Sequence, residues 1–309
     1  MSSSFTIIIP HRDCPDLLQR CLDSIPERED VQVIVVDDNS NPSIVDFDRF
    51  PGKDRNHVKI VFTKEGKGAG YARNVGLEYA MGEWIVFADA DDYFYAQGLN
   101  KLLDLVIPNE VSVVLYQYKF YREDGSSFIY PDFVASADTA EISLVTCSDT
   151  NVLCRNAVMP WTKMVRREHL DKYHIRFDEI KWGNDMIYST KLSLSINSYL
   201  VAPILVYSHE WLPNSLVNKD LNLKMFYARA VLSIKRAVLL QRAGRLDYNI
   251  FTDQWFKRIY KLNYPYSVFL KFRCFFQLGS KYCIQNWRQF TKKPLFLTLM
   301  FLKRLIGKK

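Results

Sequence analysis

Two short acidic clusters stand directly after apolar stretches of the sequence. Asp37-Asp38-Asn39-Ser40 follows the run 31–36, and Asp89-Ala90-Asp91-Asp92 follows the run 84–88. Acids after a strand commonly form turns or cap helices, and that reading would account for one such cluster. Four or five unpaired carboxylates on one edge repel one another, which a divalent cation would relieve. Hard oxygen ligands suit Mg²⁺ or Mn²⁺, so Asp89 and Asp91 are the candidate metal ligands.

The pattern of apolar residues predicts the elements that must bring these clusters together. Short apolar runs predict strands at 5–9, 31–36, 58–62, 84–88 and 111–116. Helices are predicted from about 13 to 25, from the glycine-rich stretch 66–70 to about Met81, and over 99–106. This alternation predicts an α/β domain with a mostly parallel sheet. Ligands bind such sheets at the carboxyl ends of the strands, so Pro10-His11-Arg12-Asp13 and both acidic clusters are expected on one edge.

The remainder of the chain is less regular and ends in a helical pattern. The sequence after Tyr118 has no clear period until about Met164, apart from a hairpin turn predicted at Glu123-Asp124-Gly125-Ser126. From Leu221 onward the pattern is helical, with aromatic and basic residues interleaved. We therefore expect one domain over 1–218 and a basic, aromatic-rich helical region over 219–309.

The net charge of +7 conceals two regions of opposite sign. Residues 1–220 hold 22 Lys and Arg against 32 Asp and Glu, a net charge of −10, whereas residues 221–309 hold 19 against two, a net charge of +17. The basic region is expected to meet an anionic partner such as a membrane surface. The alternative is a helical subdomain whose aromatic residues pack inside while its charges face water. No stretch reaches the roughly 18 apolar residues that cross a bilayer.

Several blocks occur in an order that resembles a known enzyme family. The chain from Phe5 to about Ser215 is similar to family 2 glycosyltransferases of the GT-A fold, which include many bacterial polysaccharide-assembly enzymes. The similar blocks are the strand ending at Pro10, Val35 to Ser40, Ala72-Arg73-Asn74-Val75-Gly76-Leu77, Gly82 to Asp92, Trp161-Thr162-Lys163, Ile175 to Glu179 and Trp182-Gly183-Asn184-Asp185. One D-x-D motif is common by chance, but this many ordered blocks are not.

The resemblance implies that a sugar is moved from a nucleotide diphosphate to an acceptor hydroxyl with inversion. Asp38 would accept a hydrogen bond from a uracil-type imide. Asp91, supported by Asp89, would hold the Mn²⁺ or Mg²⁺ that bridges the two phosphates, as a Lewis acid. Asp185 would be the general base for the acceptor hydroxyl. The residues expected to bind the nucleotide-sugar are Pro10, His11, Arg12, Asp38, Lys67, Arg73, Asp89 and Ala90.

The chain departs from the family at two of these positions, and some candidates have a second interpretation. The family usually has an aromatic residue near position 12 and Glu before the catalytic Asp, where this chain has Arg12 and Asn184. A guanidinium can stack on a base or contact phosphate. Asp185 could instead cap a helix, and Arg73 could form a structural salt bridge. Lys163 and His209 fall in blocks that resemble acceptor-side or lid segments, although a lone His more often has a structural role.

The expected partners are a nucleotide-sugar, with a UDP-sugar as the first candidate, and a glycan or polyprenyl-linked acceptor. The resemblance and the basic region together predict a cytoplasmic protein, peripheral on the inner face of the membrane and without nucleic acid. A sugar nucleotidyltransferase is the rival enzyme class, but its glycine-rich signature is missing after the first strand. A non-catalytic membrane-binding or nucleic-acid-binding protein is the other alternative, and it leaves the acidic clusters unexplained.

Overall fold

The computed structural model describes residues 4–130, 143–146, 158–211 and 223–244, together with 273, 277 and 278. The chain divides into two compact units, 1–216 and 217–309. The second unit contains the 20-residue helix α8, Leu223–Arg242, while the rest of the predicted helical region lies almost wholly outside the described residues. The elements of the first unit are β1 Phe5–His11, α1 Pro15–Asp23, β2 Val31–Asp38, β3 Val58–Thr63, α2 Ala69–Tyr79, β4 Trp84–Phe87, β5 Tyr93–Phe94, α3 Ala96–Leu103, β6 Val113–Tyr121, β7 Ser127–Tyr130, β8 Ser143–Thr146, the 3₁₀ turn Pro160–Thr162, β9 Lys163–Arg166, α5 Arg167–Lys172, α6 Asn184–Ser195 and β10 Ser198–His209.

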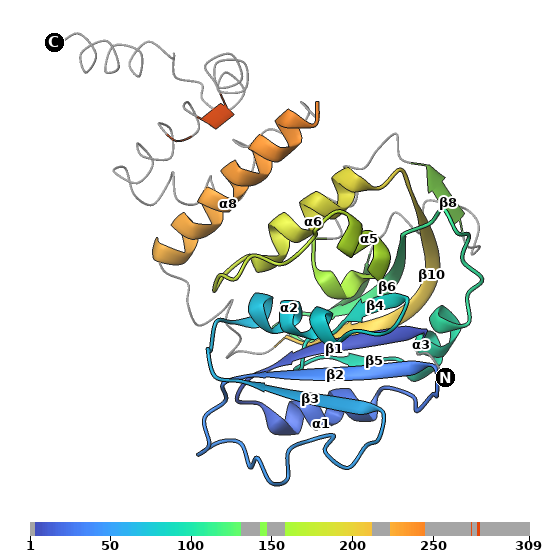
Figure 1. Cartoon of the computed structure of the whole chain (residues 1–309), viewed down its shortest axis with the longest axis vertical. Coiled ribbons are helices and arrows are strands. Elements are labelled where there is room, and N and C mark those ends of the chain that lie inside the picture. The colour runs from blue at the N-terminus through green and yellow to red at the C-terminus, as the bar shows by residue number, and fades with distance from the viewer. Residues whose placement is uncertain are drawn as a thin grey trace, which may run out of the picture. The chain divides into compact units, whose positions relative to one another are not determined.

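These strands form one mixed sheet in the order β3-β2-β1-β4-β9-β6-β10-β5, with β7 beside β6 and β8 beside β10 (Figure 1). Its longest ladders, β1 with β2, β2 with β3 and β6 with β10, are all parallel. Strand β9 runs antiparallel to both of its neighbours, β4 and β6. Strands β1, β2, β4 and β6 therefore end at the same edge of the sheet, as the sequence predicts.

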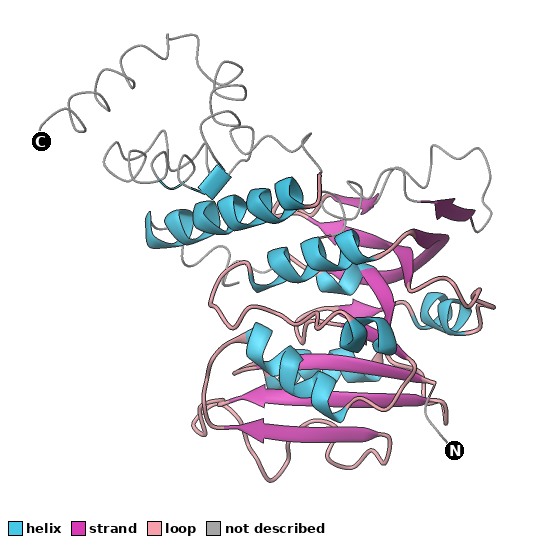
Figure 2. Ribbon diagram, turned by 45° about the horizontal axis from the view of Figure 1, so that its top comes forward, coloured by secondary structure: helices cyan, strands magenta, loops and turns pink. Residues whose placement is uncertain are grey.

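Helices cover both faces of this sheet (Figure 2). On one face, α1 and α3 pack against alternate residues of the central strands through Leu18, Leu22 and Leu99. On the other face, α2, α5 and α6 contribute Leu77, Leu170 and Leu192. All residues of β1 and β2 are buried, which explains why both strands are almost continuously apolar.

Several boundaries differ from the sequence prediction. Strand β1 continues through Pro10 to His11 because β4 ends opposite Ile8, which leaves Pro10 to pair with β2 alone. Helix α3 begins one turn earlier than predicted, at Ala96. Gly98 hides this turn in the sequence because glycine is a weak helix former. It is required there, since an added Cβ would lie 1.9 Å from the carbonyl oxygen of Leu205.

The predicted hairpin is confirmed: β6 and β7 pair antiparallel across residues 122–126, with Tyr121 opposite Ser127. Strands β5, β9 and β10 were not predicted. Among the residues that the structure describes, no helix is both long and apolar enough to cross a membrane.

Candidate functional site

The loops after β1 and β2 are joined by a buried network centred on Asp37. The Asp37 carboxylate accepts hydrogen bonds from His11 Nδ1 (2.8 Å), Ser40 Oγ (2.5 Å) and the Ser40 amide (3.0 Å). Burial alone would raise the pKa of Asp37, but these hydrogen bonds outweigh it and hold the pKa below its usual value. The second ring nitrogen of His11 accepts the Cys14 amide, so the network assigns His11 as neutral with its proton on Nδ1.

Asp38, the last residue of β2, lies at the same edge of the sheet as Asp37 but in a different environment. Its side chain is almost fully buried, and Oδ2 accepts the Gly68 amide at 2.6 Å, just before helix α2. Its other oxygen, Oδ1, is buried and has no hydrogen-bond partner among the described residues. A buried acceptor without a partner costs about 1–3 kcal/mol. A ligand that donates one hydrogen bond to Oδ1 would recover that free energy.

Two of the remaining candidates lie at the exposed rim around Asp38. Arg12 is half exposed, with Nη1 3.9 Å from Asp38 Oδ2. Lys67 is equally exposed and lies 3.7 Å from Glu179 Oε2 and 4.6 Å from the centre of the Tyr71 ring. These two cations are free to contact a bound anion, whereas Pro10 is buried within β1.

Beyond β4, Asp89, Asp91 and Asp92 each offer one carboxylate oxygen within 4.8 Å of the others. Asp92 is buried, and both of its oxygens are already bonded, to the Tyr207 hydroxyl (2.8 Å) and the Glu210 amide (2.9 Å). The same Tyr207 oxygen accepts the Asp89 amide at 2.9 Å. Asp92 therefore ties the acidic loop to β10, and Asp89 and Asp91 are the members suited to bind a cation.

Burial and the charge of Asp89 raise the pKa of Asp91 to about 6. This is the repulsion expected where carboxylates share a partly desolvated site. Oxygen-only donors at this spacing fit Mg²⁺ or Mn²⁺, either of which would neutralise the cluster. The residues present therefore fit the expected metal. Ala90, between the two ligands, is buried and turns its side chain into the core.

Arg73 of α2 connects the acidic cluster to helix α6. Its Nη2 donates to Asp89 Oδ1 at 2.5 Å and its Nη1 donates to Asn184 Oδ1 at 2.9 Å. The guanidinium lies 5.3 Å from the centre of the Phe177 ring, and the residue is 5% exposed. Both Nη groups thus have partners within the protein, and the pair with Asp89 is a salt bridge, as the alternative interpretation of this residue expected.

Asp185 is the second residue of α6, one position after the partner of Arg73. The N-cap position belongs to Gly183, whose φ of 73° is in the left-handed region that glycine adopts readily. Asp185 is therefore not the N-cap that the alternative interpretation required. Its place in the first turn favours the ionised carboxylate, because the N-terminus of a helix carries partial positive charge.

Two further polar residues lie buried near these groups. The Lys163 ammonium donates to the Met159 carbonyl at 2.7 Å, and burial lowers its pKa to about 7, against a smaller opposing effect of Asp185. His209 stacks on Phe120 with ring centres 4.6 Å apart, and its Nδ1 is buried without a partner among the described residues. Burial lowers the pKa of His209 and favours the neutral imidazole.

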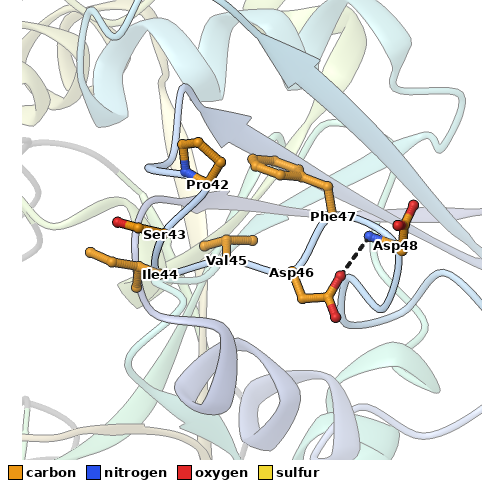
Figure 3. A pocket seen from close by; sticks show the side chains of 7 residues that line it. All are labelled: Pro42, Ser43, Ile44, Val45, Asp46, Phe47 and Asp48. Carbon is orange, nitrogen blue, oxygen red and sulfur yellow. Dashed lines mark hydrogen bonds between the residues drawn. The ribbon is translucent and has the colours of Figure 1, made fainter.

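A shallow hollow follows β2 but contains none of these groups. Figure 3 shows that it is lined by seven consecutive residues, Pro42 to Asp48. The Asp48 amide donates to Asp46 Oδ1 at 2.9 Å, and the Ser43 amide and hydroxyl both donate to Asn41 Oδ1. Because these polar groups bond to each other, the hollow presents few free groups for a ligand.

Comparison with known proteins agrees with this arrangement. Residues 6–175, over half of the chain, match the family described as Glycosyl transferase family 2. The chain belongs to this family. The matched region contains the β1, β2 and β4 loops, and it ends just before the segment that leads into α6.

Among curated proteins similar to this chain, the poly(ribitol-phosphate) beta-glucosyltransferase of Bacillus spizizenii is 26% identical over 196 residues. That alignment covers 62% of this chain and 30% of the relative. The chain spans less than two thirds of the length of this relative and of glycosyltransferase GlyG of Streptococcus pneumoniae serotype 4, which is 27% identical over 191 residues.

Solved structures of low sequence identity share the fold. Residues 1–349 of S. aureus TarS, in complex with UDP-GlcNAc, superpose with a TM-score of 0.69 and 18% identity, covering 90% of this chain and 82% of that one. The mannosyltransferase PcManGT of Pyrobaculum calidifontis, in complex with GDP-Man and Mn²⁺, gives a TM-score of 0.53 at 18% identity, covering 100% and 89%. The fold of the first unit is therefore GT-A, as the sequence resemblance implied.

The residues that sequence reasoning missed act through distant partners. Tyr207 organises Asp89 and Asp92, and Arg20 of α1 donates to the Asp91 carbonyl at 2.5 Å. Neither residue lies in a block that resembles the family. Their partners are 71 to 118 positions away, so no local pattern could have identified them.

Proposed function

We propose that this protein is an inverting glycosyltransferase that acts in cell-surface polysaccharide synthesis. It would move a sugar from a nucleotide-diphosphate sugar to a glycan hydroxyl, and a UDP-sugar is the first candidate for the donor. The observation that carries the proposal is the Arg73 bridge from Asp89 to Asn184. It holds the candidate metal loop against the start of α6, where Asp185 stands. Family membership and the UDP-sugar and GDP-sugar complexes of proteins with this fold support a nucleotide-sugar donor.

The donor would lie along the edge formed by the ends of β1, β2 and β4. Asp38 would accept the imide N–H of the base through Oδ1, its unpartnered buried oxygen. Arg12 and Lys67, at the exposed rim, would contact the base or the phosphates. His11 would not contact the donor itself, because both of its ring nitrogens are hydrogen-bonded, to Asp37 and to the Cys14 amide. These bonds would hold the loop that carries Arg12 in place.

Asp89 and Asp91 would hold Mn²⁺ or Mg²⁺ against the two phosphates. The cation would supply Lewis-acid stabilisation of the charge that develops on the departing diphosphate.

Asp185 would accept the proton of the acceptor hydroxyl as that oxygen attacks the anomeric carbon. The base and the leaving group must lie on opposite faces of the sugar, so the configuration inverts. Buried Lys163, with a pKa of about 7, would interact electrostatically with Asp185 when protonated.

The test is incubation with a panel of nucleotide-sugars, Mn²⁺ or Mg²⁺, and glycan or lipid-linked acceptors. Release of nucleoside diphosphate with an acceptor-linked product would support the proposal. Release of pyrophosphate from a nucleoside triphosphate and a sugar phosphate would instead identify a nucleotidyltransferase. No turnover, with salt-dependent nucleic-acid binding in its place, would indicate a binding protein.

Replacing Asp38 tests the base-binding role directly. We expect Asp38→Ala to weaken UDP binding by about 10-fold or more, because one hydrogen bond to a charged group contributes roughly 1.5–3 kcal/mol. Calorimetry with UDP and Mn²⁺ measures the change. Asp16→Ala, which removes an exposed carboxylate from the first turn of α1, is the matched control, and equal losses in both variants would contradict a specific role for Asp38.

We also propose that the basic region, residues 219–309, holds the protein on an anionic membrane surface next to a lipid-linked acceptor. Its charge of +17 over 221–309 supports this, since each Lys or Arg near anionic lipid contributes about 1 kcal/mol. Aromatic residues between the cations suit the headgroup boundary. Docking there would confine the search for an acceptor to two dimensions.

Co-sedimentation with liposomes tests the membrane proposal. We expect the full chain to bind vesicles that contain anionic lipid at low salt and to bind less at high salt. Neutral vesicles are the lipid control, and a variant with three Lys→Glu changes, at Lys292, Lys293 and Lys303, tests the role of the basic region. Equal binding by the full chain and this variant, or no binding by either, would remove the basic region from the mechanism.

A further inference from the structure

Arg73 is a buried cation with unequal partners. One Nη group meets a carboxylate, Asp89, and the other meets a neutral amide, Asn184. Its Nε is buried without a hydrogen-bond partner in the described part of the chain. The positive charge is therefore balanced at Asp89, and the partner at position 184 carries no charge.

The backbone holds these partners closely together. An added Cβ on Gly70, one turn before Arg73 on α2, would lie 2.4 Å from the Asp178 carbonyl oxygen and 2.9 Å from Asn184 Cβ. A glycine is therefore required for the start of α6 to approach α2 this closely. The Phe177 ring under the guanidinium and its stacking on Tyr188, with ring centres 4.0 Å apart, limit other positions for Arg73.

Arg73 and a divalent cation would share Asp89. The guanidinium donates to Oδ1 of Asp89, and a metal ion held by the same carboxylate would compete with it, because two cations near one carboxylate repel each other. A second carboxylate at position 184 would divide the hydrogen bonds and charge of Arg73 between two acids. Asp89 would then be freer to bind metal. With an amide at this position, Asp89 is the only carboxylate of the two partners that balances the charge of Arg73.

We propose that Asn184 sets the cation affinity of the Asp89–Asp91 cluster indirectly, by leaving Arg73 paired with Asp89. Asn184 is thus a positioning residue that touches neither metal nor substrate. The inference rests on the metal site of the proposed function, and it adds a regulator that lies on the same helix as the general base. Occupancy of the metal site and the start of α6 are linked through one side chain.

Binding of Mn²⁺ alone to the full chain tests this inference, measured by the electron paramagnetic resonance signal of free aqueous Mn²⁺. Asn184→Asp is nearly isosteric and gives Arg73 a second carboxylate partner at position 184. We expect it to tighten Mn²⁺ binding by about 3- to 10-fold, the size of coupling usual between contacting residues. Arg73→Gln should also tighten binding, because it removes the competing cation.

The double variant separates this path from a general effect of added negative charge. In the Arg73→Gln background, Asn184→Asp should give little further gain. An equal gain in both backgrounds would show that the carboxylate acts through space, and no gain in either would show that Arg73 does not compete with the metal. Either result overturns the inference.

Two controls keep the outcome interpretable. Thermal melts without metal show whether each variant is folded. If Arg73→Gln unfolds, Arg73→Lys replaces it, because lysine keeps the positive charge but cannot donate to Asp89 and Asn184 through two separate nitrogens. Arg176→Gln removes a positive charge that pairs with Asp171 and should not change Mn²⁺ binding. Absence of Mn²⁺ binding in every protein would overturn the metal site together with the inference. Mn²⁺ binding without sugar transfer would instead defeat the proposed reaction alone.

Discussion

Asp185→Asn is expected to lower kcat by about 10²- to 10⁴-fold, the usual contribution of a general base. The amide keeps the size of the side chain at the first turn of α6 but cannot take the acceptor proton. Binding of the nucleotide-sugar should barely change, since Asp185 would face the acceptor. Steady-state kinetics with saturating donor, together with calorimetry of donor binding, measures both quantities.

Asp171→Asn is the matched control for this substitution. Asp171 lies on α5 and forms exposed ion pairs with Arg167 and Arg176. Exposed pairs of this kind contribute about 1 kcal/mol or less, so activity should stay close to that of the unchanged protein. If Asp185→Asn abolished donor binding but left the rate per bound donor high, Asp185 would be a donor-binding or structural residue.

The second large effect is expected at the metal cluster. Asp91→Ala removes a proposed ligand and should abolish turnover to the same degree as EDTA does in the unchanged protein. The fold should survive, because removing Asp91 also removes carboxylate repulsion from the loop. Activity after exhaustive EDTA treatment, with restoration by Mn²⁺ or Mg²⁺, measures the dependence. Full turnover in EDTA would contradict the assignment of Asp89 and Asp91.

Asp92→Asn separates the role of the proposed metal ligands, Asp89 and Asp91, from the structural role of Asp92 in the loop. Asp92 accepts hydrogen bonds from Tyr207 and the Glu210 amide, and an amide can satisfy only part of that pattern. We expect this variant to lower the melting temperature while it keeps measurable metal binding. Asp91→Ala should show the opposite pattern, with weak metal binding and a retained melting temperature.

The sequence predicts the first half of the sheet well because its strands are buried on both faces. The runs that became β1, β2 and β4 are almost wholly apolar, and the acids that follow them mark the strand ends. The common edge of these ends follows from parallel pairing alone. The resemblance then adds Asp185, which lies far from the acidic clusters in the sequence.

The second half of the sheet depends on pairing that no local pattern contains. Strand β9 has only four residues and lies antiparallel between β4 and β6, so its place is determined by partners about 50 to 80 positions away. The contact of Arg73 with Asn184 spans 111 residues. Sequence analysis named both residues, but the hydrogen bonds that join them depend on the assembled fold.

The bonds from Tyr207 and Glu210 to Asp92 also bear on how the protein is made. Asp92 lies 115 and 118 residues before these two partners, so it is synthesised long before either of them. Until β10 has left the ribosome and joined the sheet, the Asp92 carboxylate lacks the donors that stabilise it in the interior. The strands β1 to β4 can pair earlier, since their contacts are nearer in sequence. A nascent chain therefore completes the candidate cation-binding loop only after nearly the whole first unit has been translated.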